Sequence, residues 1–279
     1  MKYSILVNTC DKFEDCWSPF FKLWSLYWKD CSGKIFLNTE YKSFSYPGID
    51  ITSTKVCAVH HIPLNKRATW SQCLTWVLET IDTDIILYMQ EDYFLTDKVD
   101  NDMVEHFVSL MNDNPDIPCI QLTDASFTAT VKSNIEDLYY GDNKHTSYVS
   151  CQASLWRKDI LLSLIKKYET AWDFEYFGSK RARYMNMKFL TVDPRWIHQG
   201  GYQIIPYLFT GVIGGRWYRP VVKLFEKHEI KIDFSQRGFH EEQVYSLKKR
   251  IKNKMSIRRI RSMFEIYKMR LKNVLLIKL

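Results

Sequence analysis

The chain has 279 residues, of which 46% are hydrophobic and 15% aromatic, and its formal net charge is +7. A chain of this length and composition can bury a sizeable core in one large α/β domain or in a domain with an appendage, which excludes an intrinsically disordered protein. No apolar run approaches the ~20 residues of a membrane-spanning helix, so no such span is expected.

The positive charge is concentrated at one end of the chain. Residues 248–279 contain twelve Lys and Arg and one acidic residue, which leaves 27 basic and 31 acidic residues in the remainder. The body is therefore mildly acidic, and it shows no recognition motif for nucleic acid, so we expect no nucleic-acid partner.

Seven cysteines, at positions 10, 16, 31, 57, 73, 119 and 151, are scattered without a C-x-x-C pair, and no signal peptide precedes the first β-rich run. This pattern predicts free thiols in a reducing cytoplasm. It argues against a structural zinc site, because no two cysteines are close enough in sequence to form half of one.

The first 122 residues alternate between β-rich and amphipathic runs. Strands are expected at residues 3–9, 34–39, 84–89 and 118–122, and helices at residues 18–29, 67–81 and 103–111. The helix at 67–81 has the clearest pattern, with apolar residues at spacings of three and four. The run at 84–89 is continuously apolar, which is typical of a strand buried on both faces of a parallel sheet. The alternation predicts a mostly parallel, doubly wound α/β sheet.

The later part of the chain is less regular. Residues 123–146 lack periodicity and are expected to form a long surface loop. They precede a strand at 149–156, helices at 158–168 and from Trp172, and strands at 188–192 and 202–209. Beyond Gly215 the pattern is helical and increasingly basic.

Acidic residues follow two of the expected strands directly. Glu91 and Asp92 end the buried run, and Thr9 and Asp11 follow the first strand. Ligands of such sheets bind beyond the carboxyl ends of the strands, and buried acids are costly unless they meet water, cations or donors. Carboxylates that hold Mg²⁺ or Mn²⁺ against a nucleoside diphosphate would neutralise that leaving group. From these residues alone, a solvated acidic turn or a helix cap is an equally good interpretation.

Several segments together resemble the GT-A-type bacterial glycosyltransferases of surface-polysaccharide (capsule and lipopolysaccharide) biosynthesis. They are ILVNTCDKFEDCW with PFF, ATWSQCLTWVLETI, TDIILYMQEDYFL, and CQASLWRKDILLSLIKKYETAWDFE with FGSKRAR, and the similarity spans roughly residues 3–217. The resemblance implies a GT-A-like (Rossmann-like) mixed sheet flanked by helices, a nucleoside-diphosphate sugar donor and a D-x-D-like metal site. It further implies a catalytic domain over residues 1–217, with a nucleotide-sugar half at about 1–122 and an acceptor half at about 123–217. Residues 218–279 would form a helical basic extension.

By this resemblance, Gln90, Glu91 and Asp92 occupy the D-x-D position, with Asp92 as the metal ligand and Glu91 beside the donor. Glutamine replaces the first aspartate, so coordination of Mn²⁺ or Mg²⁺ rests on one carboxylate, runs through water, or is absent. Thr9 and Asp11 match the place where the nucleoside is held, although a turn or N-cap would also explain them.

Three further positions are carried over from the same resemblance. Arg67 corresponds to a basic residue near the diphosphate, or is a surface group. Glu175, with Asp173 as second choice, corresponds to the general base that deprotonates the acceptor hydroxyl in inverting enzymes; an acidic helix start is the alternative. His198 would complete the metal site or touch the diphosphate, although most lone histidines do neither.

Residues 257–275 mix Arg and Lys with many apolar side chains, the profile of a helix that lies on an anionic bilayer. Packing on the catalytic domain, or binding to a partner, is the alternative. Together these features predict an inverting hexosyltransferase, cytoplasmic and peripheral on the inner face of the cell membrane, which extends a lipid-linked surface glycan. The rivals are a nucleotidyltransferase, which should carry a glycine in the loop after the first strand where residues 9–12 have none, and a non-catalytic glycan- or membrane-binding protein.

Overall fold

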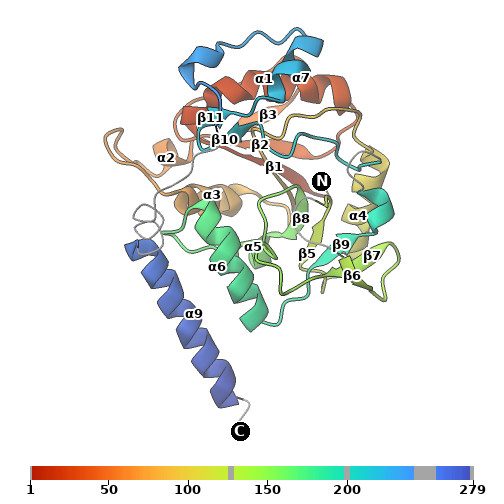
Figure 1. The fold of residues 1–279 in the computed structure, drawn as a ribbon, viewed down its shortest axis with the longest axis vertical. Helices are drawn as coiled ribbons and strands as arrows, with labels where there is room; N and C mark the ends of the chain where they lie inside the picture. Colours follow the sequence, from red (N-terminus) through yellow and green to blue (C-terminus); the bar gives the residue numbers. More distant parts are fainter. Residues whose placement is uncertain (1, 125–128, 198–201, 242–255, 277–279) are drawn as a thin grey trace.

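The computed structural model describes residues 2–124, 129–197, 202–241 and 256–276. Within these residues, nine strands form one sheet with helices on both faces (Figure 1). The strands lie in the order β3 (Ile51–Ser53), β2 (Lys34–Asn38), β1 (Ser4–Asn8), β4 (Ile85–Gln90), β8 (Ser154–Arg157), β5 (Cys119–Gln121), β9 (Leu190–Val192), β7 (Leu138–Gly141) and β6 (Ala129–Lys132).

The sheet is mixed, and its parallel part contains the predicted strands β1, β2 and β4. β3, β2, β1 and β4 pair in parallel, with Asn8 level with both Asn38 and Gln90. β8 then runs antiparallel between β4 and β5, and β5 pairs in parallel with β9. The hairpin β6–β7 lies at the edge beyond β9. The carboxyl ends of β1, β2 and β4 therefore lie side by side, where a ligand of such a sheet would bind.

Successive side chains of the central strands point to opposite faces, and each face is covered by a separate set of helices. Ile5 and Val7 of β1 belong to one core and Leu6 to the other. The first core is closed by α1 (Glu14–Tyr27), α4 (Asn101–Asp113) and α7 (Val221–Lys227). The second is closed by α2 (Val56–Val59), α3 (Trp70–Thr80), α5 (Lys158–Leu164) and α6 (Ala171–Tyr184).

Local capping decides where two of the predicted helices begin. The Thr69 side chain accepts the backbone N–H of Gln72 while the Gln72 side chain accepts that of Thr69, and this capping box starts α3 at Trp70 rather than at the predicted residue 67. A short 3-10 turn, η1 (Asp11–Phe13), leads directly into α1, which therefore begins four residues earlier than predicted and contains Pro19.

Three parts of the sequence-based assignment are wrong. The surface loop expected at residues 123–146 contains the hairpin β6–β7. The strand expected at 202–209 makes only isolated bridges, such as Leu95 with Tyr207, because this segment crosses the end of β4 instead of joining the sheet. β3 was not predicted, since its three residues show no usable pattern.

The chain after residue 217 begins within the main core and ends in a projecting helix. Val221 and Phe225 of α7 are buried beside Trp217, near the short hairpin β10 (Val212–Ile213) and β11 (Arg216–Trp217). Single turns η2 (Pro194–Trp196) and η3 (Phe234–Gln236) lie between the later elements. The last helix, α9 (Ile257–Leu276), packs along α6 and extends away from the body (Figure 1). In the described part of the chain, no helix combines the length and hydrophobicity that a membrane span requires.

Candidate active site

The loops after β1 and β2 are joined by a reciprocal contact between two acids. Asp11 accepts the backbone N–H groups of Glu40 and Tyr41 at 2.9 Å each and that of Lys42 at 3.2 Å. In return, the Glu40 carboxylate accepts the backbone N–H of Asp11 at 3.2 Å. Four bonds between two neighbouring loops give this end of the sheet a defined shape. The place predicted to hold the nucleoside is therefore built in part by Asp11.

Thr9, predicted to hold the nucleoside with Asp11, is buried and engaged. Its hydroxyl accepts the indole N–H of Trp17 at 2.9 Å and so fixes α1 against the end of β1. The same hydroxyl donates to the Cys10 carbonyl at 3.4 Å, so its one proton is already used and the contacts present here position a helix.

The acidic pair after β4 is buried, and its two members differ. One oxygen of Asp92, Oδ2, accepts the Thr210 hydroxyl at 2.6 Å and the backbone N–H groups of Gly211 and Val212 at 3.1 and 3.0 Å. Burial raises the pKa of Asp92, and these three donors oppose the rise. Asp92 therefore anchors the 210–212 loop through one oxygen.

Glu91 has more negative charge around it than Asp92 has. Burial, followed by the charge of Asp92, raises the pKa of Glu91 well above its ordinary value, and the Arg237 charge only partly opposes this. Burial together with the nearby carboxylates of Glu91 and Glu40 raises the pKa of the Cys10 thiol to about 12. Two buried carboxylates at a strand end would be stabilised in their ionised form by positive charge nearby.

Arg237 supplies part of that charge, and no pattern in the sequence pointed to this residue. Its guanidinium forms a bidentate pair with Asp15 of α1 and donates to the carbonyl of Lys12 at 2.7 Å. A cavity of about 500 Å³ opens here, bordered by Asp11, Asp15, Gly214, Arg216 and Arg237 among others. This cavity lies beside the β1 loop and brings acidic and basic groups to the expected donor side.

Glu175 lies on the other side of the β4 end, where α6 meets the loop before β8. Its Oε1 accepts the backbone N–H of Cys151 at 2.8 Å, and burial raises its pKa. The Cys151 thiol contacts the Tyr88 hydroxyl, which in turn accepts the side-chain amides of Asn8 at 3.1 Å and Gln90 at 3.3 Å. A chain of contacts therefore connects Glu175 to Gln90, the first residue of the D-x-D-like position.

The other predicted site residues do not join this group. Asp173 is occupied at the start of α6, where it pairs with Arg259 of α9 at 2.7 Å and accepts the Thr170 hydroxyl at 2.9 Å. Arg67 is exposed on the loop before α3. His198 lies outside the described residues. Asp173 therefore matches the helix-start interpretation that the sequence left open, and the role of Glu175 as a base stays a prediction.

The acidic pair offers two carboxylates with oxygen donors, which suit Mg²⁺ or Mn²⁺ when substrate phosphates and water complete the shell. The one described group with three His, Cys, Asp or Glu ligand atoms in mutual reach is a different set, Glu40 with Cys57 and Cys73.

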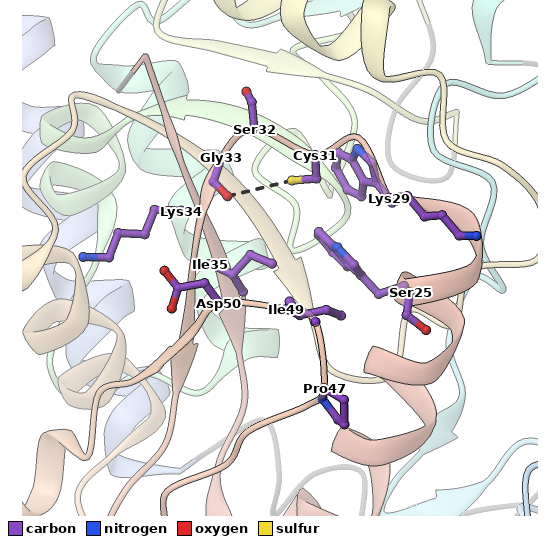
Figure 2. Close-up of a pocket in the computed structure, with 13 residues that line it drawn as sticks. Ser25, Lys29, Cys31, Ser32, Gly33, Lys34, Ile35, Pro47, Ile49 and Asp50 are labelled. Carbon is purple, nitrogen blue, oxygen red and sulfur yellow. Dashed lines mark hydrogen bonds between the residues drawn. The ribbon is translucent and has the colours of Figure 1, made fainter.

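A second cavity, of about 510 Å³, lies at the other end of the strands (Figure 2). It is bordered by the end of α1, by Gly33 and Lys34 where β2 begins, and by Asp50 ahead of β3. Because β2 and β3 are parallel to β1 and β4, this cavity lies at the amino ends of the strands, away from Glu91 and Asp92.

No protein-family model matches the chain, and no curated protein sequence matches it significantly. Solved structures match it at low similarity. A CMP-2-keto-3-deoxy-manno-octonic acid synthetase in complex with CTP aligns with 82% of this chain and 98% of its own, at a TM-score of 0.43 and 11% identity. Mycobacterium tuberculosis glucosyl-3-phosphoglycerate synthase with Mn²⁺ and UDP-glucose aligns over 66% and 65%, at a TM-score of 0.40 and 8% identity. S. aureus TarS aligns over 69% and 57%, at a TM-score of 0.41 and 7% identity.

The last two alignments span less than two thirds of those chains. At such low TM-scores the similarities carry no argument about function. The predicted fold class, an α/β fold with a mixed sheet flanked by helices, is confirmed by the strand topology itself.

Proposed function

We propose that the chain is a nucleotide-sugar-dependent glycosyltransferase of the GT-A type. The observation that supports this proposal is the placement of two kinds of carboxylate around the end of β4. Glu91 and Asp92 lie directly after the strand, where the charge of Arg237 acts on Glu91, and Glu175 is connected to the strand through Cys151 and Tyr88. The side with Glu91 and Asp92 suits a charged sugar donor. The side with Glu175 suits a group that accepts a proton.

On the donor side, the loop held by Asp11, with Thr9 at its start, would carry the nucleoside. The diphosphate would lie toward the acidic pair, with Asp92 and Glu91 as ligands of Mn²⁺ or Mg²⁺. Such a cation, when bound, neutralises charge on the diphosphate leaving group. The raised pKa values of both carboxylates are consistent with this role, because bound positive charge would relieve their repulsion and desolvation.

On the acceptor side, Glu175 would accept the proton of the attacking hydroxyl. Its Oε1 is held by the Cys151 N–H, and the Ser150 side chain also hydrogen-bonds to the carboxylate, so the group is fixed in place where it would meet the acceptor. A pKa raised by burial makes a carboxylate a better proton acceptor. Direct attack assisted by one base gives inversion at the anomeric carbon, so we assign the inverting hexosyl-transfer class.

The acceptor would be a lipid-linked glycan at an anionic membrane surface, reached through α9. Exposed apolar residues recur along this helix at spacings of three and four, namely Ile257, Ile260, Phe264, Tyr267 and Leu271. Exposed basic residues flank them, namely Arg261, Lys268, Arg270 and Lys272. The opposite face carries buried Ser262, which bonds to Glu169 at 2.6 Å and fixes the helix to the body. An outward apolar stripe with basic edges suits an anionic bilayer.

The experiment that tests the enzyme class is a thermal-shift screen of nucleoside diphosphates and nucleotide sugars, with and without Mn²⁺, followed by transfer assays with the donors that bind. We expect a shift of several degrees for one nucleotide family, larger with Mn²⁺. Release of pyrophosphate from a nucleoside triphosphate and a sugar would assign a nucleotidyltransferase instead. If no nucleotide shifts the melting temperature, the protein is a non-catalytic binding protein and the proposal is wrong.

A further inference from the structure

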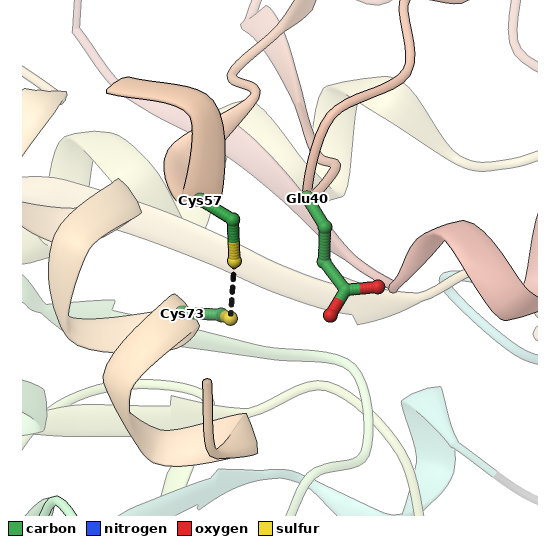
Figure 3. A group of neighbouring side chains, drawn as sticks. All are labelled: Glu40, Cys57 and Cys73. Carbon is green, nitrogen blue, oxygen red and sulfur yellow. Dashed lines mark hydrogen bonds between the residues drawn. The ribbon is translucent and has the colours of Figure 1, made fainter. Parts of the chain in front are cut away.

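Three potential metal ligands that are far apart in sequence meet beneath the β2 loop. Glu40 follows β2, Cys57 lies in α2 and Cys73 lies in the second turn of α3, and their side chains point toward one another (Figure 3). The carboxylate oxygen and the two sulfurs all lie within 4.8 Å of one another. The argument against a structural zinc site rested on the distance between cysteines in the sequence. The packing of α2 on α3 brings Cys57 and Cys73 together in space, so that argument does not apply to them.

The distance between the two sulfurs matches shared coordination better than a covalent bond. Cys57 Sγ and Cys73 Sγ are 3.9 Å apart. Two thiolates on one zinc ion, each at about 2.3 Å and at the tetrahedral angle, are separated by about 3.8 Å. A disulfide would require a separation of about 2.05 Å. Closing the cluster on a zinc ion therefore needs little movement of either sulfur.

The chemistry of the three ligand atoms also indicates which metal would bind. Thiolates favour zinc and other soft ions, whereas Mg²⁺ and Mn²⁺ prefer oxygen ligands. Two thiolates and one carboxylate leave one tetrahedral position for water. Cys57 and Cys73 are buried, and Glu40 is half-buried at the edge of the cluster, which leaves a side open to solvent.

Backbone contacts hold the ligands in place without any ion. The Glu40 carbonyl accepts the N–H groups of Cys57 at 3.0 Å and Ala58 at 3.1 Å, so two of the ligands belong to one hydrogen-bonded unit. Cys73 is fixed by α3, whose start is set by the Thr69 capping box. Preorganised ligands bind a metal more tightly, because less chain has to be ordered on binding.

We propose that Glu40, Cys57 and Cys73 bind Zn²⁺, with water as the fourth ligand. The ion would connect α2, α3 and the β2 loop. Glu40 also accepts the Asp11 N–H at 3.2 Å and donates its own N–H to Asp11 at 2.9 Å, so the ion would stiffen the loop after β1. The proposal is independent of the proposed enzyme activity.

The test is titration of the reduced, metal-free full-length protein with Co²⁺ as a spectroscopic substitute for zinc. We expect one equivalent to give thiolate-to-cobalt charge-transfer absorption, and one equivalent of Zn²⁺ to remove it. Cys57→Ser and Cys73→Ser should each abolish the charge-transfer intensity or at least halve it. Cys31→Ser is the matched control and should leave the spectrum unchanged, because that thiol lies in the cavity at the other end of the strands. Glu40→Gln keeps an acceptor for the Asp11 N–H and should weaken binding at least tenfold.

A second measurement uses only the unmodified chain, in case a cysteine variant does not fold. Zn²⁺ should protect Cys57 and Cys73 from alkylation, as read by peptide mass spectrometry, while the other thiols react as before. The proposal is overturned if folded wild-type protein gives no charge-transfer band, if the band keeps more than half of its wild-type intensity in both cysteine variants, or if zinc leaves the alkylation of the two cysteines unchanged.

Discussion

Glu175 Oε1 accepts the backbone N–H of Cys151 at 2.8 Å, so a carboxylate of α6 is fixed to the loop that leads into β8. Glutamine can accept the same N–H through its amide oxygen, and Glu175→Gln should therefore fold normally and bind donor as wild type does. It cannot take a proton, so we expect kcat for transfer to fall by about a hundredfold to ten-thousandfold.

The pH profile gives this prediction an independent readout. Because burial raises the pKa of Glu175 above its ordinary value of 4.5, the acid limb of the kcat/KM profile should lie above pH 4.5 and disappear in Glu175→Gln. Asp173→Asn is the control, since Asp173 is paired with Arg259 and lies outside the proposed chemistry. Transfer by Glu175→Gln at the wild-type rate would remove Glu175 from the mechanism.

Glu91→Gln should stabilise the ligand-free protein at neutral pH while impairing its function. The pKa of Glu91 is raised well above 4.5, so the folded state favours the protonated form, and the buried charge costs stability once the pH exceeds 4.5. Each pKa unit corresponds to a penalty on the order of 1 kcal/mol. The advantage of the variant should thus vanish below pH 4.5 and grow as the pH rises through the folded-state pKa.

Urea unfolding of both proteins between pH 4 and 8, without metal, measures this difference, with Glu14→Gln as a control at an exposed acid. Added Mn²⁺ and nucleotide should reverse the order and favour the wild type. Equal stability of the two proteins at every pH would show that Glu91 is not an uncompensated buried charge.

Asp92 should be needed for folding as well as for binding. Asp92→Ala removes the acceptor for Thr210, Gly211 and Val212 and leaves two backbone N–H groups without that partner, a loss of roughly 1–3 kcal/mol for each buried group. Asp92→Asn keeps one acceptor oxygen and should lose less stability, yet still lose the Mn²⁺ dependence of nucleotide binding. Urea unfolding and a metal titration separate the two effects, and an unchanged Mn²⁺ response in Asp92→Asn would contradict the metal assignment.

The sequence predicted those parts of the site that depend on local pattern. The apolar run before Glu91 and Asp92 is a buried strand, and its parallel pairing with β1 follows from the β/α alternation. Contacts between distant segments were not predictable. Thr210 reaches Asp92 across 118 positions, and Arg237 reaches Asp15 across 222. A lone Thr or Arg carries no periodicity that would reveal such a partner.

The same limit explains the errors in the sheet. The antiparallel insertion of β8 between β4 and β5 is a choice of partner, and a strand of the same composition can pair in either direction. The two strands of the hairpin β6–β7 have only four residues each, which is too short a stretch for periodicity to reveal a strand. Prediction fails in this protein where pairing, rather than local propensity, decides the structure.

The buried pair of Arg181 and Glu169 should be the most sensitive ionic contact in the body. Arg181 Nη2 lies 2.5 Å from Glu169 Oε2, both side chains are almost fully buried, and Ser262 of α9 bonds to the same carboxylate. Arg181→Met leaves the buried Glu169 charge without its partner and should lower the unfolding free energy by about 3–5 kcal/mol. Replacing Arg181 and Glu169 together by Met should recover much of this loss, and a double variant as unstable as Arg181→Met would contradict the argument.

The outward face of α9 predicts membrane binding that depends on both apolar and basic residues. Phe264 and Leu271 are 59% and 44% exposed, so neither is needed for the packing of α9 on α6. The double variant Phe264→Ser and Leu271→Ser should fold as wild type does. It should bind vesicles that contain anionic phosphatidylglycerol about tenfold or more weakly in a co-sedimentation assay, because two large apolar side chains no longer enter the interface.

Leu64→Ser combined with Val131→Ser is the matched control, since it removes two exposed apolar side chains from other parts of the surface and should leave binding unchanged. Binding of the wild type should weaken with salt and on neutral phosphatidylcholine, because Arg261 and Lys268 lie beside the apolar stripe. Spacings of three and four would equally serve a helix pair, so sedimentation velocity decides between the two. A dimer that the Phe264 and Leu271 substitutions dissolve, together with unchanged vesicle binding, would assign this face to a second copy of the chain and not to a bilayer.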